Sequence, residues 1–222
     1  MGQKNQLWWD LPAIESLHLN KRIYELDDNI YRKNLEGLSD LLEVKDLLNV
    51  QVRRLSLGER MKMELIAALV HNPRVLLLDE PTIGLDIISQ KNIRDFLKLY
   101  NEKSKTTIIL TSHYMKDIED MCKRAIVINQ GELVYDGKLN EINGEFNQKK
   151  IVKIQFLKPI NQNDIQRLGN IKESSPISAT IEVEKKDLKT ISSMIFNEFD
   201  VVDFNIEDIP LEDSIALLYK KG

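Results

Sequence analysis

The feature that most constrains the fold is a continuous apolar run, Val75 to Leu78, that ends in the acidic pair Asp79-Glu80. A second apolar run occupies 106–111 (TTIILT). Strands that are apolar throughout are typical of parallel sheets that are covered on both faces. Helical patterns precede, separate and follow the two runs, at 57–70, 89–103 and 114–121. Strands that alternate with helices predict an α/β architecture.

The pattern changes on both sides of this α/β region. Before it, apolar residues in 15–48 recur at spacings of three to five, which predicts two or three amphipathic helices. After a hairpin with its turn at Gln130-Gly131, strand and helix patterns follow in the order βαββαβ, the split βαβ of ferredoxin-like domains. We therefore expect two domains, 1–146 and 147–222, of which the second is a small α+β domain.

The composition excludes several classes of protein. The formal charge of −4 argues against nucleic acid as the main partner, because neutralising phosphates needs a basic face. The single cysteine, Cys122, cannot form an internal disulfide framework, which favours a reducing, cytosolic compartment. No apolar run approaches the ~20 residues needed to cross a bilayer. If the protein works at a membrane, another chain must supply the spans.

The acidic pair is the strongest chemical feature of the sequence. Open α/β sheets bind ligands at the carboxyl ends of their strands. Adjacent residues of an extended chain point in opposite directions, so Asp79 and Glu80 should have different tasks. One would hold Mg²⁺ through water, and the other would polarise an attacking water. The alternative is a strand that simply ends in a solvated acidic turn.

A histidine follows the second apolar run, in Thr111-Ser112-His113. At the carboxyl end of a strand, His113 could hydrogen-bond a γ-phosphate as negative charge develops on it. A lone polar histidine in a loop can equally be a surface residue. The sequence alone leaves both interpretations open.

The segment 55–59 (LSLGE) stands at the start of the helical pattern 57–70. Ser56 and Glu59 fit a capping box, which stabilises a helix by about 0.5–2 kcal/mol and needs no functional role. The same geometry suits an anion, because a helix N-terminus offers unpaired N–H groups and Gly58 lets a phosphate approach the backbone. The motif alone is compatible with either role.

Taken together, the motifs resemble those of the ATP-binding subunits of ABC (ATP-binding cassette) transporters. The resemblance covers 2–137, and the order and spacing of the motifs agree with the family. LSLGE is similar to the signature motif, 74–81 (RVLLLDEP) to the Walker B strand with its catalytic glutamate, 82–86 (TIGLD) to the D-loop, and 112–113 to the switch region. The signature departs from the usual family wording at Leu57 and Glu59, as it does in subgroups resembling drug, antibiotic and polysaccharide exporters.

The resemblance implies a role for each residue of the catalytic set. Glu80 would orient the hydrolytic water and Asp79 would hold Mg²⁺. His113 would contact the γ-phosphate of ATP. Gln3 stands at the position of the Q-loop glutamine, where it would sense Mg²⁺ and relay to a transmembrane permease subunit. The family thus implies ATP and Mg²⁺ as cofactors and a place at the inner, cytoplasmic face of the plasma membrane.

The signature and D-loop residues would act across a dimer, because the family works as two cassettes that sandwich two ATP molecules. By resemblance, Ser56, Gly58 and Glu59 would belong to the surface that contacts the ATP held by the opposite subunit. Asp86 would couple the two sites. The segment 15–50 would form the helical subdomain of the cassette.

The sequence contains no G-x-x-x-x-G-K-[ST] phosphate loop (Walker A). The segment from Gly131 to Gly137-Lys138-Leu139 differs in glycine spacing, has no hydroxyl after the lysine, and lies in a predicted hairpin. We therefore expect the C-terminal portion of an exporter-like ATP-binding subunit that lacks the N-terminal segment. The chain alone should be inactive, and the apolar faces of 75–78 and 107–110 should be exposed unless other polypeptide covers them.

Two other functions compete with this expectation. A non-hydrolysing module could donate its signature helix in trans to an intact partner and regulate it. An ABC-type ATPase could act on DNA or ribosomes, but the acidic charge and the absence of long heptad repeats argue against it.

Overall fold

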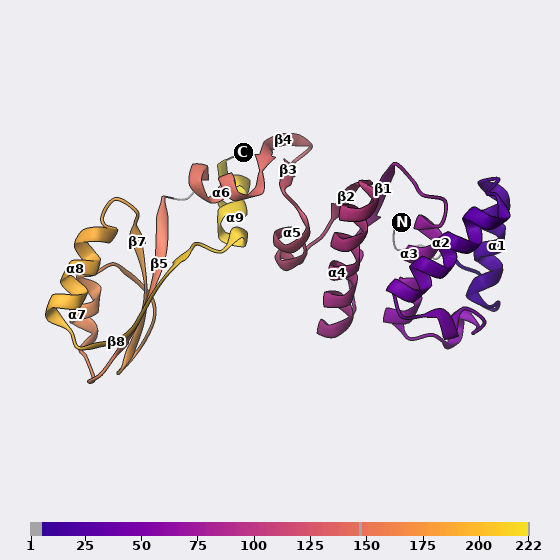
Figure 1. Ribbon diagram of the computed structural model, residues 1–222. Coiled ribbons are helices and arrows are strands. Elements are labelled where there is room, and N and C mark those ends of the chain that lie inside the picture. Colours follow the sequence, from indigo (N-terminus) through magenta and orange to yellow (C-terminus); the bar gives the residue numbers. More distant parts are fainter. Residues whose placement is uncertain (1–5, 147, 222) are drawn as a thin grey trace. The chain divides into compact units, whose positions relative to one another are not determined.

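The computed structural model describes residues 6–146 and 148–221 (Figure 1). The chain forms two compact units, Met1–Cys122 and Lys123–Gly222. This division falls earlier than the predicted boundary at 146/147. The reason is that β3 (Arg124–Asn129) and β4 (Glu132–Lys138) pair with each other as an antiparallel hairpin, in a sheet separate from that of the first unit. The assignment of functions to 1–146 and 147–222 stays a prediction.

The first unit begins with helices that pack around one central helix. Its elements are α1 (Ala13–Ile23), α2 (Asp28–Leu41), the short 3₁₀ helices η1 (Lys45–Leu47) and η2 (Val52–Arg54), α3 (Leu57–Leu69), β1 (Val75–Asp79), α4 (Ile87–Ser104), β2 (Thr107–Thr111) and α5 (Met115–Met121). The core of the unit runs through α3, where Met63, Leu65 and Ile66 are fully buried. The amphipathic helices expected in 15–48 are thus present as α1 and α2.

The two predicted apolar strands form a parallel pair. β1 and β2 run in register from Val75↔Thr107 to Asp79↔Thr111, so their carboxyl ends coincide. Leu76 and Leu78 are buried, whereas Val75, Leu77 and Ile109 are 53%, 59% and 55% exposed. Only one face of this strand pair is therefore covered in this chain. The expected exposure of apolar residues in 75–78 and 107–110 is confirmed.

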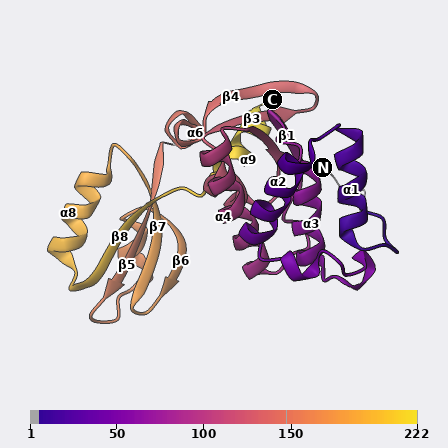
Figure 2. The same cartoon turned by 45° about the vertical axis from the view of Figure 1, so that its right-hand side comes forward.

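The second unit contains the hairpin and the predicted α+β domain. After β4 come α6 (Leu139–Phe146), β5 (Lys149–Phe156), α7 (Gln162–Gln166), β6 (Asn170–Ser175), β7 (Ser178–Glu184), α8 (Leu188–Glu198), β8 (Val201–Asp208) and α9 (Leu211–Lys221). The antiparallel sheet has the order β6-β7-β5-β8, and α8 lies on one face of it (Figure 2). This is the split βαβ topology that the sequence pattern predicts.

The sheet of the second unit has one apolar face. Val152, Ile154 and Phe156 of β5 alternate with more exposed residues and pack with Ile181 of β7 and Ile195 of α8. The period of two in these strands is what buries one face against the helices. In the part of the chain that the structure describes, no helix is both long and apolar enough to span a membrane.

Candidate active site

The two strand ends of the first unit bring the predicted acidic pair next to the second strand. The Thr111 hydroxyl donates a hydrogen bond of 2.6 Å to Oδ1 of Asp79, and the backbone N–H of Glu80 donates to the Thr111 carbonyl at 3.1 Å. The register Asp79↔Thr111 places these groups opposite each other. The carboxyl ends of β1 and β2, called the strand edge below, are therefore fixed by side-chain hydrogen bonds as well as by the strand pairing.

Glu80 has an unusual backbone and a buried side chain. Its φ is +52°, a left-handed conformation that costs a non-glycine residue of order 1–3 kcal/mol and persists only where the surroundings enforce it. The residue is only 8% exposed. Lys105, the C-cap of α4, has a similar φ of +57°, so it is the burial of the Glu80 carboxylate, more than its backbone, that supports a functional role over a solvated acidic turn.

The structure brings Glu80 and His113 together, as expected if they share one site. The backbone N–H of His113 donates to Oε2 of Glu80 at 3.1 Å, and Nε2 of the imidazole lies 3.5 Å from Oε1 of Glu80. The His113 side chain is 89% exposed. The histidine thus contacts the buried carboxylate while the rest of its ring is open to a ligand.

A buried ionic network lies behind these residues. Asp117 of α5 is fully buried and accepts hydrogen bonds from the hydroxyls of Thr82 and Ser112, the latter at 2.9 Å. Arg94 of α4 donates to Asp117 at 2.9 Å and lies 3.2 Å from Asp120. Sequence reasoning missed this network, because a charged residue on an amphipathic helix is ordinarily solvated.

The signature segment forms the start of α3. The Ser56 hydroxyl accepts a hydrogen bond from the N–H of Glu59 at 3.3 Å, while the Glu59 carboxylate accepts from the N–H and the hydroxyl of Ser56, both at 2.8 Å. This is a complete capping box, so the structural interpretation of the motif is confirmed. Its role toward a nucleotide stays a prediction.

The starts of α3 and α4 lie side by side. A Cβ atom added at Gly58 would stand 2.8 Å from the Ser89 hydroxyl of α4, so this contact needs glycine or a movement of Ser89. Asp86 caps α4 and accepts from the Ser89 hydroxyl at 2.6 Å, a bond that holds the pKa of Asp86 below its usual value. The observed bonds of Asp86 are thus those of a helix cap, and the roles of Gly58 and Asp86 toward a nucleotide stay predictions.

The segment that follows the predicted Q-loop glutamine is anchored to α3. Gln3 itself lies outside the described residues. The carboxylate of Glu64 accepts hydrogen bonds from the backbone N–H groups of Gln6 at 3.0 Å and Leu7 at 3.4 Å. Burial raises the pKa of Glu64 even though these donors act in the opposite direction. Glu64 was not predicted from the sequence, since no motif marks a buried carboxylate in a helix.

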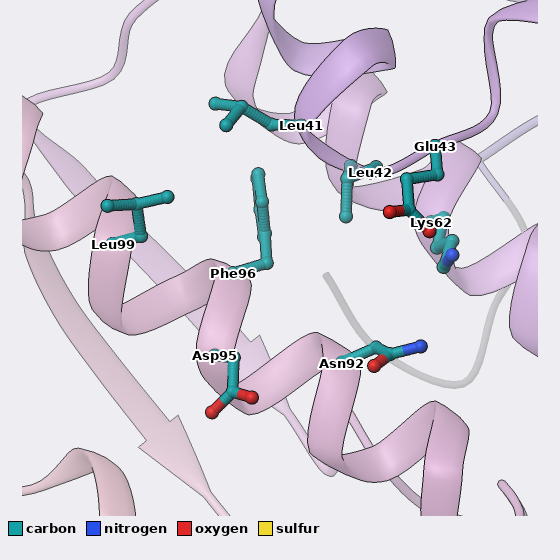
Figure 3. A pocket seen from close by; sticks show the side chains of 8 residues that line it. All are labelled: Leu41, Leu42, Glu43, Lys62, Asn92, Asp95, Phe96 and Leu99. Atoms are coloured by element: carbon teal, nitrogen blue, oxygen red, sulfur yellow. The ribbon is translucent and has the colours of Figure 1, made fainter.

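A separate hollow of about 210 Å³ lies between α2, α3 and α4 (Figure 3). Phe96 projects into it toward Leu41 and Leu42, and Lys62 and Asp95 give it polar sides. The predicted site residues do not belong to its lining. It is therefore distinct from the strand edge that carries Glu80.

Two family profiles match the chain. One, described as "AAA domain, putative AbiEii toxin, Type IV TA system", matches residues 9–115. The other, described as "EvrA-like ABC transporter, C-terminal domain", matches residues 148–207, the range of the ferredoxin-like fold. The two matches therefore separate the site-bearing part of the chain from the small α+β domain.

Curated relatives are ATP-binding proteins of ABC transporters. NatA of Bacillus subtilis (strain 168) is 34% identical over 141 residues, which are 64% of this chain and 57% of NatA. The uncharacterised protein YdbJ of the same organism is 28% identical over 211 residues, which are 93% of this chain and 64% of YdbJ. The chain thus spans less than two thirds of either relative.

Solved structures show the same similarity. cbiO1 of Clostridium perfringens, described as part of the ABC transporter complex cbiONQ, matches with a TM-score of 0.57 and 25% identity over 64% of this chain and 56% of cbiO1. A dimeric ATP-binding cassette in a post-hydrolysis state with ADP and Pi matches with a TM-score of 0.53 and 26% identity over 61% of this chain and 60% of the cassette. The chain is thus a homologue of ABC transporter ATP-binding proteins and matches part of their α/β ATPase cassette fold.

Proposed function

We propose that this chain supplies the water-orienting and signature-bearing portion of an ATPase that couples ATP hydrolysis to export through a transmembrane permease. The observation that supports this most directly is the buried Glu80, which is held in a left-handed conformation against His113. A carboxylate that orients water must be fixed within hydrogen-bond reach of the water, and a strained, enclosed position provides this.

Each residue at the strand edge would have its own task. Glu80 would orient and polarise the attacking water, and the exposed imidazole of His113 would donate a hydrogen bond to the transferring phosphate. Asp79 would hold Mg²⁺ as one carboxylate ligand, since Mg²⁺ in such sites takes its other ligands from phosphates and water. Bound Mg²⁺ would neutralise charge on the phosphate oxygens. Among the described residues, no group of three or more His, Cys, Asp or Glu is placed to hold a metal ion.

The rest of the phosphate site would come from further polypeptide. The sequence contains no phosphate loop, and the apolar residues Leu77 and Ile109 are more than half exposed on the β1–β2 pair. We expect a strand that carries a glycine-rich loop and its lysine to extend this sheet and cover these residues. Without it, this chain alone should not hydrolyse ATP.

The partners follow from the same proposal. A second cassette would receive the signature surface of Ser56, Gly58 and Glu59, and Asp86 would couple the two sites. Gln3 would relay between Mg²⁺ and the permease at the cytoplasmic face of the membrane. The alternative is a module that does not hydrolyse ATP and lends its signature helix in trans. The capping box at the start of α3 and the buried residues of its second half support this second possibility, because this chain alone holds the helix in place.

The test is to supply the missing phosphate loop. The full chain is fused behind the N-terminal segment of NatA, and ATP hydrolysis is measured for the fusion and for the unfused chain. We expect hydrolysis only in the fusion. Glu80→Gln should reduce it by at least about 100-fold, whereas Glu119→Gln, an identical change at an exposed carboxylate of α5, should leave it within about twofold.

The outcomes separate the two proposals. Equal rates for the fusion and for its Glu80→Gln variant would refute the role of Glu80. The trans module is tested by adding the unfused chain to a complete cassette whose own signature serine has been replaced. Recovery of hydrolysis in that mixture, together with an inactive fusion, would favour the module.

A further inference from the structure

The buried carboxylate of Asp117 joins the two segments that carry the proposed catalytic pair. Thr82 stands two residues after Glu80, and Ser112 directly precedes His113. Both hydroxyls donate to Oδ2 of Asp117. One carboxylate oxygen therefore holds the turn after β1 and the turn after β2 at the same point.

The other oxygen of Asp117 is fixed from a third element. Arg94 of α4 donates to Oδ1 at 2.9 Å, and the pair is nearly inaccessible, with side chains 8% and 0% exposed. Asp120 contacts the same guanidinium at 3.2 Å but is 27% exposed. Arg94 thus provides the charge that a fully buried carboxylate needs, because an unpaired buried charge is strongly unfavourable.

The placement of these bonds argues against a purely structural ion pair. A pair that only joined α4 to α5 would not need the hydroxyls of both loop segments. Ser112 also accepts the N–H of Tyr114 at 3.0 Å, so its hydroxyl fixes the backbone on both sides of His113. The left-handed Glu80 persists only if its surroundings over-determine it, and Thr82 restrains the turn that follows.

We propose that Asp117 is a positioning residue that sets the geometry of Glu80 relative to His113. Its carboxylate accepts hydrogen bonds from Thr82, after β1, and from Ser112, after β2, and so holds the two turns together; we call this set of bonds the clamp. Arg94 keeps the carboxylate ionised and oriented. The consequence for hydrolysis rests on the proposed function, but the clamp itself is a property of the nucleotide-free chain. The residue does not touch substrate in this role.

The clamp is tested by amide hydrogen exchange, followed by NMR on the full nucleotide-free chain. Asp117→Asn keeps the shape of the side chain but removes its charge. Asp120→Asn is the matched control, because Asp120 also lies on α5 and contacts Arg94. We expect the His113 amide to exchange about tenfold faster in Asp117→Asn, relative to amides of the β1–β2 ladder, and to change less than about twofold in the control.

A milder variant covers the case in which Asp117→Asn does not fold. Ser112→Ala removes one hydroxyl donor and leaves the Arg94–Asp117 pair intact. It should still accelerate exchange at His113 selectively. The proposal is overturned if Asp117→Asn and Ser112→Ala accelerate exchange of the His113 amide no more than they accelerate exchange of the ladder amides. It is also overturned if Asp120→Asn accelerates exchange at His113 as much as Asp117→Asn does.

The catalytic consequence is read in the fused protein. Asp117→Asn should lower kcat by about tenfold and leave KM for ATP within about twofold, since it alters placement of the water-orienting group and not ATP contacts. An inactive unmodified fusion would contradict the proposed function, while the exchange experiment would still decide the clamp. An unchanged kcat in an active fusion would refute the catalytic consequence.

Discussion

Replacing Arg94 by methionine should destabilise the first unit much more than replacing a neighbouring lysine. The change keeps the aliphatic stem but leaves the fully buried carboxylate of Asp117 without its cation. Breaking a buried ion pair from one side costs about 3–5 kcal/mol. The hydroxyls of Thr82 and Ser112 still solvate the carboxylate, so we expect the lower end of this range, about 3 kcal/mol.

Tryptophan fluorescence in urea measures this effect in the right place. The chain has two tryptophans, Trp8 and Trp9, and both belong to the first unit. The control is Lys98→Met, one turn further along α4, because Lys98 lies 4.0 Å from Asp120 and is 39% exposed. Exposed pairs contribute less than about 1 kcal/mol, so this variant should unfold near the urea midpoint of the unmodified chain.

A double-mutant cycle then isolates the interaction. Arg94→Met leaves the charge of Asp117 unpaired, and Asp117→Asn removes that charge. The double variant should therefore lose about 2 kcal/mol less unfolding free energy than the sum of the two single losses. The reasoning is refuted if Arg94→Met costs less than about 1 kcal/mol, the value of an exposed pair. It is equally refuted if the two losses simply add.

Further predictions concern single side chains of the first unit. The folded-state pKa of Glu64 is raised by burial, so its ionisation opposes folding as pH rises above 4.5; Glu64→Gln should flatten this loss of stability in urea titrations at several pH values. Burial, and then the charge of Asp117, raise the pKa of the Cys122 thiol, so iodoacetamide should modify it more slowly than a free thiol, and faster after Asp117→Asn. Ser56→Ala should cost about 1 kcal/mol of unfolding free energy in urea, through loss of the capping box.

The strand edge could be predicted from the sequence because it depends on local patterns. Apolar runs such as 75–78 identify strands, and parallel pairing places their carboxyl ends together. That is sufficient to bring Glu80 near His113 without knowledge of any other contact. Capping boxes are equally local, so Ser56 and Glu59 could be placed in advance.

Other features could not be predicted because they depend on tertiary contacts between distant residues. Arg94 and Asp117 belong to helices with many charged residues, and only the packing of α4 against α5 decides which charges become buried. The same limit applies to Glu64, whose partners are backbone N–H groups far away in sequence. The pairing of β3 with β4 in a sheet of their own is likewise a tertiary feature.

The proposed site has two parts: the residues Glu80 and His113, which are held by contacts within this chain, and the phosphate cradle, which this chain does not contain. Glu80 and His113 are fixed by bonds within this chain, through Thr111 and the Asp117 network, although β1 and β2 form only a two-stranded sheet. An incomplete sheet would otherwise leave its strand ends weakly restrained, because edge strands have few backbone partners. The side-chain network replaces that restraint. If the proposed function holds, polypeptide that completes the cassette would need to supply the phosphate cradle and cover the apolar face, because the contact between Glu80 and His113 is already formed within this chain.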